Sequence, residues 1–241
     1  MRKLQRILVF LVSFSFFIIA QESNQSVFIN EDFANLDSWE PLTFPKIKSH
    51  SRYTIESKDT LTYLKAITDS SASGIVFQRI FNVNNYPNVE WKWKVSNVYD
   101  KGNAKSKQGD DYPLRVYIIF EYEPEAAGIL EKAKYNAAKL LYGEYPPHSS
   151  LNYIWANKDH RERIITNTYT SKAKMIVLRS GKRNVGKWVT ENINILQDYK
   201  KAFGKKPPGR ASVAIMSDSD NTGESAVGYI DYIKIHNRSS K

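Results

Sequence analysis

Apolar and polar residues alternate over many short stretches of this chain, and the clearest stretch runs from Leu114 to Tyr122. Every second residue from Leu114 onward in this stretch is apolar. A period of two predicts a strand with one face in a core. The positions between carry Arg115, Tyr117 and Glu121, so we expect the other face to line a groove or to lie exposed.

Similar stretches recur along the chain, separated by segments rich in Gly, Asn, Asp and Ser. They are residues 53–55, 61–67, 75–83, 89–98, 151–155, 174–179, 187–196, 211–216 and 226–235. Regularly spaced short strands with turn signals between them predict an all-β fold, an antiparallel β-sandwich of jelly-roll type. We expect residues 26–236 to form one such domain, with 237–241 as a tail.

Residues 124–142 break the strand pattern. Their apolar residues, such as Ile129, Ala133 and Leu140, recur at helical spacing, and Pro124 suits a first helical turn. The segment therefore predicts an amphipathic helix inserted between two strands and packed over an end of the sandwich. A mobile lid over a cleft is the alternative.

Two further patterns concern local structure. Trp91 and Trp93 alternate with charged residues, which favours burial in the core over an exposed platform for stacking on sugars. Residues 197–203 predict one or two helical turns that end at Gly204.

The N-terminus has the pattern of a secretory signal peptide over residues 1–20, with cleavage near Ala20 and a polar linker at 21–25. The apolar run 7–19 is shorter than the about 20 residues of a transmembrane helix, although an uncleaved anchor is the alternative. We expect a secreted or periplasmic protein without a transmembrane span after cleavage. Cysteine is absent, which excludes disulfides, thiolate metal sites and cysteine nucleophiles.

The composition points to anionic partners and to sugars without selecting one ligand. The formal net charge of +10 over 241 residues raises encounter rates with anionic partners, yet no recognition motif predicts a specific nucleic acid. The 15 Tyr and 11 Phe suit strands and can stack on sugars.

The candidate ligand site lies on the polar face of the strand at 114–122. Arg115 and Tyr117 occupy that face, and Asn152 falls on the polar side of the next predicted strand. Asp110 and Asp111 precede the strand and are expected to form the rim or support of the site, with their carboxylates pointing in different directions. A buried Asn152 with ordinary hydrogen-bond partners is the alternative.

Two other acidic features are candidates for chemistry. Glu191 stands on an otherwise apolar strand side, which is typical of a general acid or of a structural ion pair, and with Asp110 or Asp111 it would form the acid pair of a glycan hydrolase or lyase. Asp218, Asp220 and Asn221 place oxygen ligands in a tight loop, so structural Ca²⁺ or a hydrogen-bonded acidic turn is expected there. Paired metal-binding histidines, Gly-rich phosphate loops and a Gly-x-Ser-x-Gly motif are absent.

Five segments in this order resemble a bacterial secreted family known as domain of unknown function 3047. They are residues 109–117, 151–155, 186–191, 198–204 and 218–222. The resemblance covers roughly residues 33 to 235 and implies a β-sandwich with no established activity. The two ends of the chain also resemble carbohydrate-binding jelly-roll modules, an analogy at the level of the fold.

The function predicted from these features is a secreted, non-catalytic binding module for a glycan or another ligand of the cell envelope. The alternatives are a glycan-active hydrolase or lyase that uses carboxylates on the same sandwich, and a structural protein of the envelope.

Overall fold

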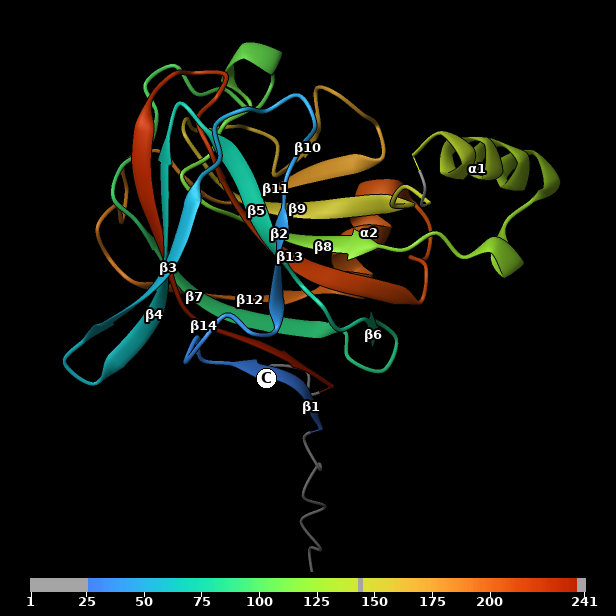
Figure 1. The fold of residues 1–241 in the computed structure, drawn as a ribbon, viewed down its shortest axis with the longest axis horizontal. Helices are drawn as coiled ribbons and strands as arrows, with labels where there is room; N and C mark the ends of the chain where they lie inside the picture. The colour runs from blue at the N-terminus through green and yellow to red at the C-terminus, as the bar shows by residue number, and fades with distance from the viewer. Residues whose placement is uncertain (1–25, 143–144, 238–241) are drawn as a thin grey trace, which may run out of the picture.

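The computed structural model describes residues 26–142 and 145–237, whose strands form two sheets facing each other across one core (Figure 1). The predicted signal peptide at 1–20, the linker at 21–25 and most of the tail lie outside these residues. The strands and helices of the described residues lie between Val27 and His236, so this part of the chain contains both sheets and the core. Among the described residues, no helix is long and apolar enough to cross a membrane.

The first sheet has six strands. In spatial order these are β12 (Val189–Asn194), β7 (Asn88–Val95), β14 (Ser225–His236), β4 (Leu61–Asp69) and β3 (Arg52–Lys58), with β1 (Val27–Glu31) also paired to β14. The pairings in this sheet are antiparallel. This sheet covers one side of the core.

The second sheet has eight strands. In spatial order these are β10 (Ile164–Thr166), β11 (Ala173–Ser180), β9 (Ser149–Ala156), β8 (Arg115–Phe120), β13 (Arg210–Asp218), β5 (Ala72–Phe77) and β2 (Trp39–Leu42), with β6 (Phe81–Asn82) also paired to β13. The fold is thus an all-β sandwich of jelly-roll type, as predicted.

One pairing differs from the predicted antiparallel arrangement, because β9 and β11 are parallel. An antiparallel pair can be joined by a two-residue turn, whereas a parallel pair needs a connection of a dozen or more residues. Residues 157–172, which include β10, supply that connection. The sequence pattern shows the strands but not this long return.

The core lies between the sheets and contains the apolar positions predicted from the alternation. Val116, Ile118 and Phe120 of β8 are fully buried there, while Arg115 and Tyr117 point to the outer face of the eight-stranded sheet. The predicted burial of Trp91 and Trp93 is confirmed: both belong to the core, with ring centroids 5.7 Å apart.

The inserted segment forms a 3₁₀ turn (Pro124–Ala126) and the helix α1 (Ile129–Tyr142), so the predicted helix is confirmed. Its predicted packing is wrong. In Figure 1 α1 projects away from the sandwich, and Ile129, Leu130 and Leu140 are exposed. Helical spacing shows that apolar residues share a face, but it does not show which face meets the rest of the protein.

The shorter helices fix two connections. The helix α2 (Ile195–Phe203) confirms the predicted turns and ends at Gly204, whose φ of 72° is left-handed and favours glycine. A 3₁₀ turn (Lys107–Gly109) precedes β8 and leads into Asp110 and Asp111.

Candidate functional site

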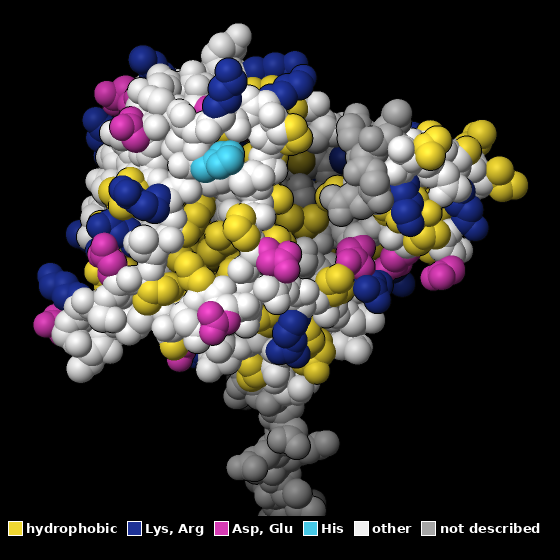
Figure 2. Space-filling view, viewed as in Figure 1, with side chains coloured by type: hydrophobic (Ala, Val, Ile, Leu, Met, Phe, Trp, Pro, Cys, Tyr) yellow, Lys and Arg dark blue, Asp and Glu magenta, His cyan; other side chains and the backbone are white. Residues whose placement is uncertain are grey.

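A pocket of about 680 Å³ opens on the outer face of the eight-stranded sheet. Strands β8, β9 and β13 form its floor, and the loop between β2 and β3 contributes residues 44–47 to its wall. Figure 2 shows this face hollowed near its centre, with apolar side chains along the hollow and acidic side chains at its edge. None of the α1 side chains that the structure describes lines the pocket, so the alternative of a lid formed by this helix has no support in the geometry.

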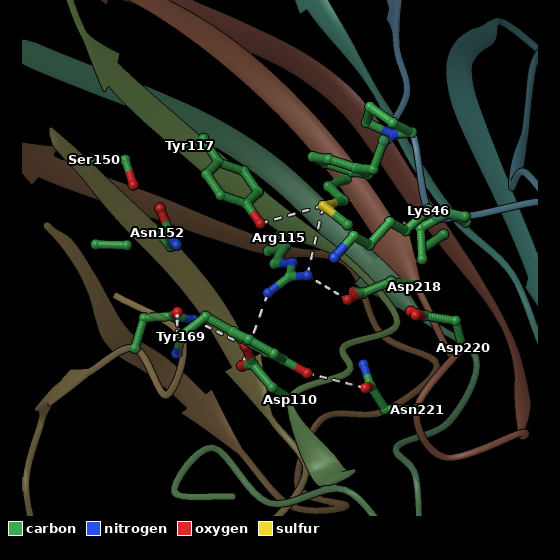
Figure 3. Close-up of a pocket in the computed structure, with 17 residues that line it drawn as sticks. Lys46, Asp110, Arg115, Tyr117, Ser150, Asn152, Tyr169, Asp218, Asp220 and Asn221 are labelled. Atoms are coloured by element: carbon green, nitrogen blue, oxygen red, sulfur yellow. Dashed lines mark hydrogen bonds and ion pairs between the residues drawn. The ribbon is translucent and has the colours of Figure 1, made fainter. Parts of the chain in front are cut away.

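Arg115 lies at the centre of the pocket floor, between two carboxylates (Figure 3). Its Nη2 contacts Asp218 Oδ2, and its Nη1 lies 3.9 Å from Asp110 Oδ1. The guanidinium also lies over the rings of Tyr112 and Tyr117, with Cζ 5.0 Å and 5.4 Å from their centroids. Burial by itself would lower the pKa of Arg115, but the Asp218 carboxylate raises it above its ordinary value, so the side chain stays charged.

The strand pairing explains how Arg115 meets Asp218. Strand β13 lies beside β8, with Met216 opposite Arg115, and Asp218 follows two residues later on the same face. Asp218 is 1% exposed and Arg115 is 5% exposed, so both charges are almost completely removed from water. Burial raises the pKa of Asp218, and Arg115 opposes that rise.

Asp110 and Asp111, predicted as the rim or support of the site, are both buried. Asp110 lines the pocket and accepts hydrogen bonds from the Tyr112 hydroxyl (3.0 Å) and from Asn167 Nδ2 (2.8 Å). Burial raises the pKa of Asp110, and the charge of Arg115 opposes this effect. Its carboxylate is therefore part of the wall.

The carboxylate of Asp111 points elsewhere, as the extended backbone predicted. It accepts hydrogen bonds from the backbone N–H of Thr222 (2.6 Å) and from Asn221 Nδ2 (2.8 Å). Asp111 therefore supports the loop that follows β13, and this loop carries Asp220 and Asn221 into the pocket wall.

Asn152 lies on the same outer face, opposite Tyr117 in the β8–β9 register. The predicted polar group of Arg115, Tyr117 and Asn152 is thus brought together in one pocket. The Nδ2 of Asn152 donates to the Met175 sulfur (3.3 Å), which is a weak acceptor.

Two buried polar atoms in the pocket floor have no hydrogen-bond partner in the described part of the chain, namely Arg115 Nε and Asn152 Oδ1. Buried polar groups in folded proteins are nearly always paired with protein or with ordered water. One of these atoms is a donor and the other is an acceptor. Both atoms are almost inaccessible to solvent, so a ligand would reach them only after neighbouring side chains shift.

The pocket wall is largely apolar and contains residues that the sequence did not single out. They are Phe44, Pro45, Lys46, Ile47, Asn167, Tyr169 and Met216. Tyr169 is 57% exposed, and its hydroxyl lies 3.1 Å from Asn221 Oδ1. Met216 alternates with the core residue Ile215 on β13, so its position on the outer face was readable from the strand pattern. The loop at 44–47 carries no comparable signal.

Glu191 is not part of this site. It lies on β12 in the other sheet and faces inward, where it accepts hydrogen bonds from Arg179 Nε (2.7 Å) and Trp93 Nε1 (3.0 Å). The pocket lies on the opposite side of the eight-stranded sheet, so Glu191 does not form an acid pair with Asp110 or Asp111. The contacts of Glu191 correspond to the structural ion pair that was the alternative.

The acidic residues near the pocket include one cluster with oxygens close enough to hold a cation. Carboxylate oxygens of Asp111, Asp218 and Asp220 lie within 4.8 Å of one another. The predicted ligand Asn221 instead donates to Asp111 and accepts from Tyr169. Asp218 already contacts Arg115, and both oxygens of Asp111 already accept hydrogen bonds, so this cluster fits a cation poorly.

A comparison with solved structures found several proteins that align with most of this chain at low sequence identity. The family 11 carbohydrate-binding module of the cellulosomal cellulase Lic26A-Cel5E of Clostridium thermocellum has 12% identity and a TM-score of 0.42, over 88% of this chain and 93% of that chain. The native family 12 xyloglucanase from Bacillus licheniformis has 11% identity and a TM-score of 0.44, over 88% and 98%. Similarities at this level carry no argument about function.

Curated proteins gave no match to this chain. A family model does match, and it covers residues 37–234, which include the pocket and nearly the whole sandwich. The chain therefore belongs to the family described as protein of unknown function DUF3047.

Proposed function

We propose that this protein is a secreted or periplasmic, non-catalytic binding module for a glycan, which it holds in the pocket on the eight-stranded sheet. The observation that carries the proposal is the pocket itself, whose floor brings Arg115, Tyr117 and Asn152 together among apolar side chains. A sugar hydroxyl both accepts and donates, so it can pair with polar side chains of either kind.

The remaining walls support a neutral, polyhydroxylated ligand. Tyr117, Tyr169 and Phe44 supply aromatic surface of the kind that packs against the C–H face of a sugar ring. The volume of about 680 Å³ lies within the range of pockets for small ligands. A neutral ligand leaves the Arg115–Asp218 ion pair intact, whereas an anionic ligand would compete with Asp218 for Arg115 and meet Asp110 and Asp220.

The test is affinity electrophoresis and a glycan array with the chain from residue 21 to 241. We expect retention on at least one polysaccharide, and we expect Asn152→Ala and Tyr169→Ala each to weaken it about tenfold, the effect of one hydrogen bond or one ring contact. The matched control is Asn192→Ala, an exposed asparagine on β12 in the other sheet. Retention on none of the polysaccharides, or equal loss in the control, contradicts the proposal.

The second candidate is a hydrolase or lyase in the same pocket. The observation that favours it is the raised pKa of the buried Asp110, which lines the pocket, because a protonated carboxyl is what a general acid requires. Incubation with the retained polysaccharide distinguishes the two functions. If the parent protein cleaves the polysaccharide and Asp110→Asn no longer cleaves it but is still retained on it, the protein is an enzyme. If the parent protein leaves the polysaccharide unchanged, it is a binding module.

The third alternative from the sequence, a structural protein of the envelope without a small ligand, has less support. It predicts no groove, whereas the outer face carries a pocket with polar atoms in its floor.

A further inference from the structure

The helix α1 is held to the sandwich by one side. Of the α1 side chains that the structure describes, only that of Tyr135 is buried. Its ring stacks on the ring of Tyr122, with the two centroids 3.7 Å apart. Its hydroxyl accepts a hydrogen bond from Lys172 Nζ (2.6 Å). These contacts fix which side of the helix faces the body.

The opposite side of α1 is apolar and faces solvent. Ile129 is 87% exposed, and Leu130 and Leu140 are each 88% exposed. At about 100° per residue these three and the exposed Ala133 and Ala137 fall in one sector of the helix, directed away from Tyr135. We call these five residues the apolar strip.

The apolar strip is unusual for this protein. Six large apolar side chains are exposed in the described part of the chain, and three of them belong to the strip. The other three, Val27, Ile80 and Tyr169, come from separate segments. A contiguous exposed apolar patch marks a surface that contacts something else.

Lysines border the apolar strip on both sides. Lys132 lies beyond one edge and Lys134 beyond the other, and both are exposed. Lys139 lies nearer the side of Tyr135, with its Nζ 4.5 Å from the centroid of the Tyr145 ring. Glu131 lies on the side of Tyr135, with its carboxylate 3.9 Å from His148. An apolar strip flanked by lysines is the pattern of helices that lie in the interface of a bilayer.

We propose that α1 docks on an anionic lipid surface, with the apolar strip in the boundary between headgroups and acyl chains and with Lys132 and Lys134 on the headgroups. A helix of 14 residues is about 21 Å long, so it lies in the plane of the surface and does not span it. The helix projects beyond the sandwich (Figure 1), which lets the strip meet a flat surface without collision. Residues 21–241 keep a net charge of +7, since the +10 of the full chain includes Arg2, Lys3 and Arg6, and this charge favours the same approach.

A second copy of the chain is a poorer occupant of the strip. A twofold interface places the same patch of both copies face to face, so the lysines on the edges of the strip would approach one another. An anionic bilayer provides the opposite charge at every position. Charge complementarity therefore selects the lipid surface.

The experiment is flotation of the chain from residue 21 to 241 with lipid vesicles, because the apolar run at 7–19 would bind vesicles by itself. We expect binding to phosphatidylcholine vesicles with about 30% phosphatidylglycerol and at least tenfold weaker binding to phosphatidylcholine alone. The variant Ile129→Gln/Leu130→Gln/Leu140→Gln should lose binding by about 30-fold or more. Ile80→Gln, a change at an exposed isoleucine elsewhere, should bind as the parent does.

A second variant tests the role of charge. Lys132→Gln/Lys134→Gln should lower binding to the anionic vesicles by about fivefold per lysine and reduce its dependence on salt. Circular dichroism verifies that both variants remain folded. Failure of the parent chain to float with anionic vesicles overturns the proposal, and so does full binding by the apolar-strip variant. A dimer in sedimentation velocity that the apolar-strip variant dissociates assigns the strip to a second copy instead.

Discussion

Replacing Arg115 with methionine should destabilise the protein strongly, because it leaves the carboxylate of Asp218 buried without its cation. Both side chains are at least nine-tenths buried, and removal of one partner of such a pair costs about 3–5 kcal/mol. The contacts with the rings of Tyr112 and Tyr117 add about 0.5–2 kcal/mol. Methionine fills part of the volume, so we expect a total loss of about 3–5 kcal/mol at pH 7.

The size of this loss should depend on pH, because Arg115 is the group that opposes the raised pKa of Asp218. Without Arg115 the folded-state pKa of Asp218 rises further above its unfolded value of 3.8. A carboxyl with a raised folded-state pKa holds its proton in the folded protein at pH values where the unfolded chain releases it. The free energy of unfolding of the variant therefore falls as pH rises through this window, and the loss should shrink to about 1–2 kcal/mol at pH 4.

Denaturation in urea at several pH values between 4 and 8 measures these free energies. For a domain of this size the loss at pH 7 corresponds to a decrease in Tm of roughly 6–20 °C. The double variant Arg115→Met/Asp218→Asn removes the unpaired charge and should recover about 2 kcal/mol relative to Arg115→Met. A loss at pH 7 below about 1 kcal/mol, or one that does not change with pH, refutes the reasoning.

Three further outcomes follow from local geometry. Gly204→Ala should cost about 1 kcal/mol in urea denaturation because of its positive φ. The control Gly209→Ala has no positive φ, and its added Cβ would meet only side-chain atoms at 3.4 Å or more, so it should be close to neutral. Trp93→Phe removes the indole donor to Glu191 and should cost about 1–2 kcal/mol; an unchanged midpoint would show that this hydrogen bond contributes nothing. The Tm measured with millimolar Ca²⁺ and the Tm measured with a chelator should agree within about 1 °C, because the carboxylates of Asp111 and Asp218 already have hydrogen-bond or ion-pair partners. A Tm that is higher by more than this with Ca²⁺ would identify a cation site.

The alternation along β8 illustrates how far local pattern reaches. It predicted that Val116 and Ile118 enter the core and that Arg115 and Tyr117 share the opposite face, and the structure has this arrangement. The reasoning succeeds because successive side chains of a strand must point to opposite faces. It also placed Asn152 correctly, since β9 follows the same rule.

The wall of the pocket shows where local pattern stops. The loop at 44–47 joins two strands without any periodicity, and Tyr169 lies in the long connection between β9 and β11. Nothing in the neighbouring residues predicts that these segments meet above Arg115. Their positions follow from the return of distant strands to one sheet.

By itself, the sequence determined the β-sandwich, the inward and outward faces of its main strands, the stop at Gly204 and the presence of a helix near residues 124–142. The tertiary structure alone decided that Asp218 meets Arg115 across 103 residues, that Glu191 lies in the other sheet, and that α1 turns its apolar strip to solvent. The reason is physical. A local period fixes the direction of a side chain relative to its own strand or helix, whereas the neighbours of that element depend on contacts between residues far apart in the chain.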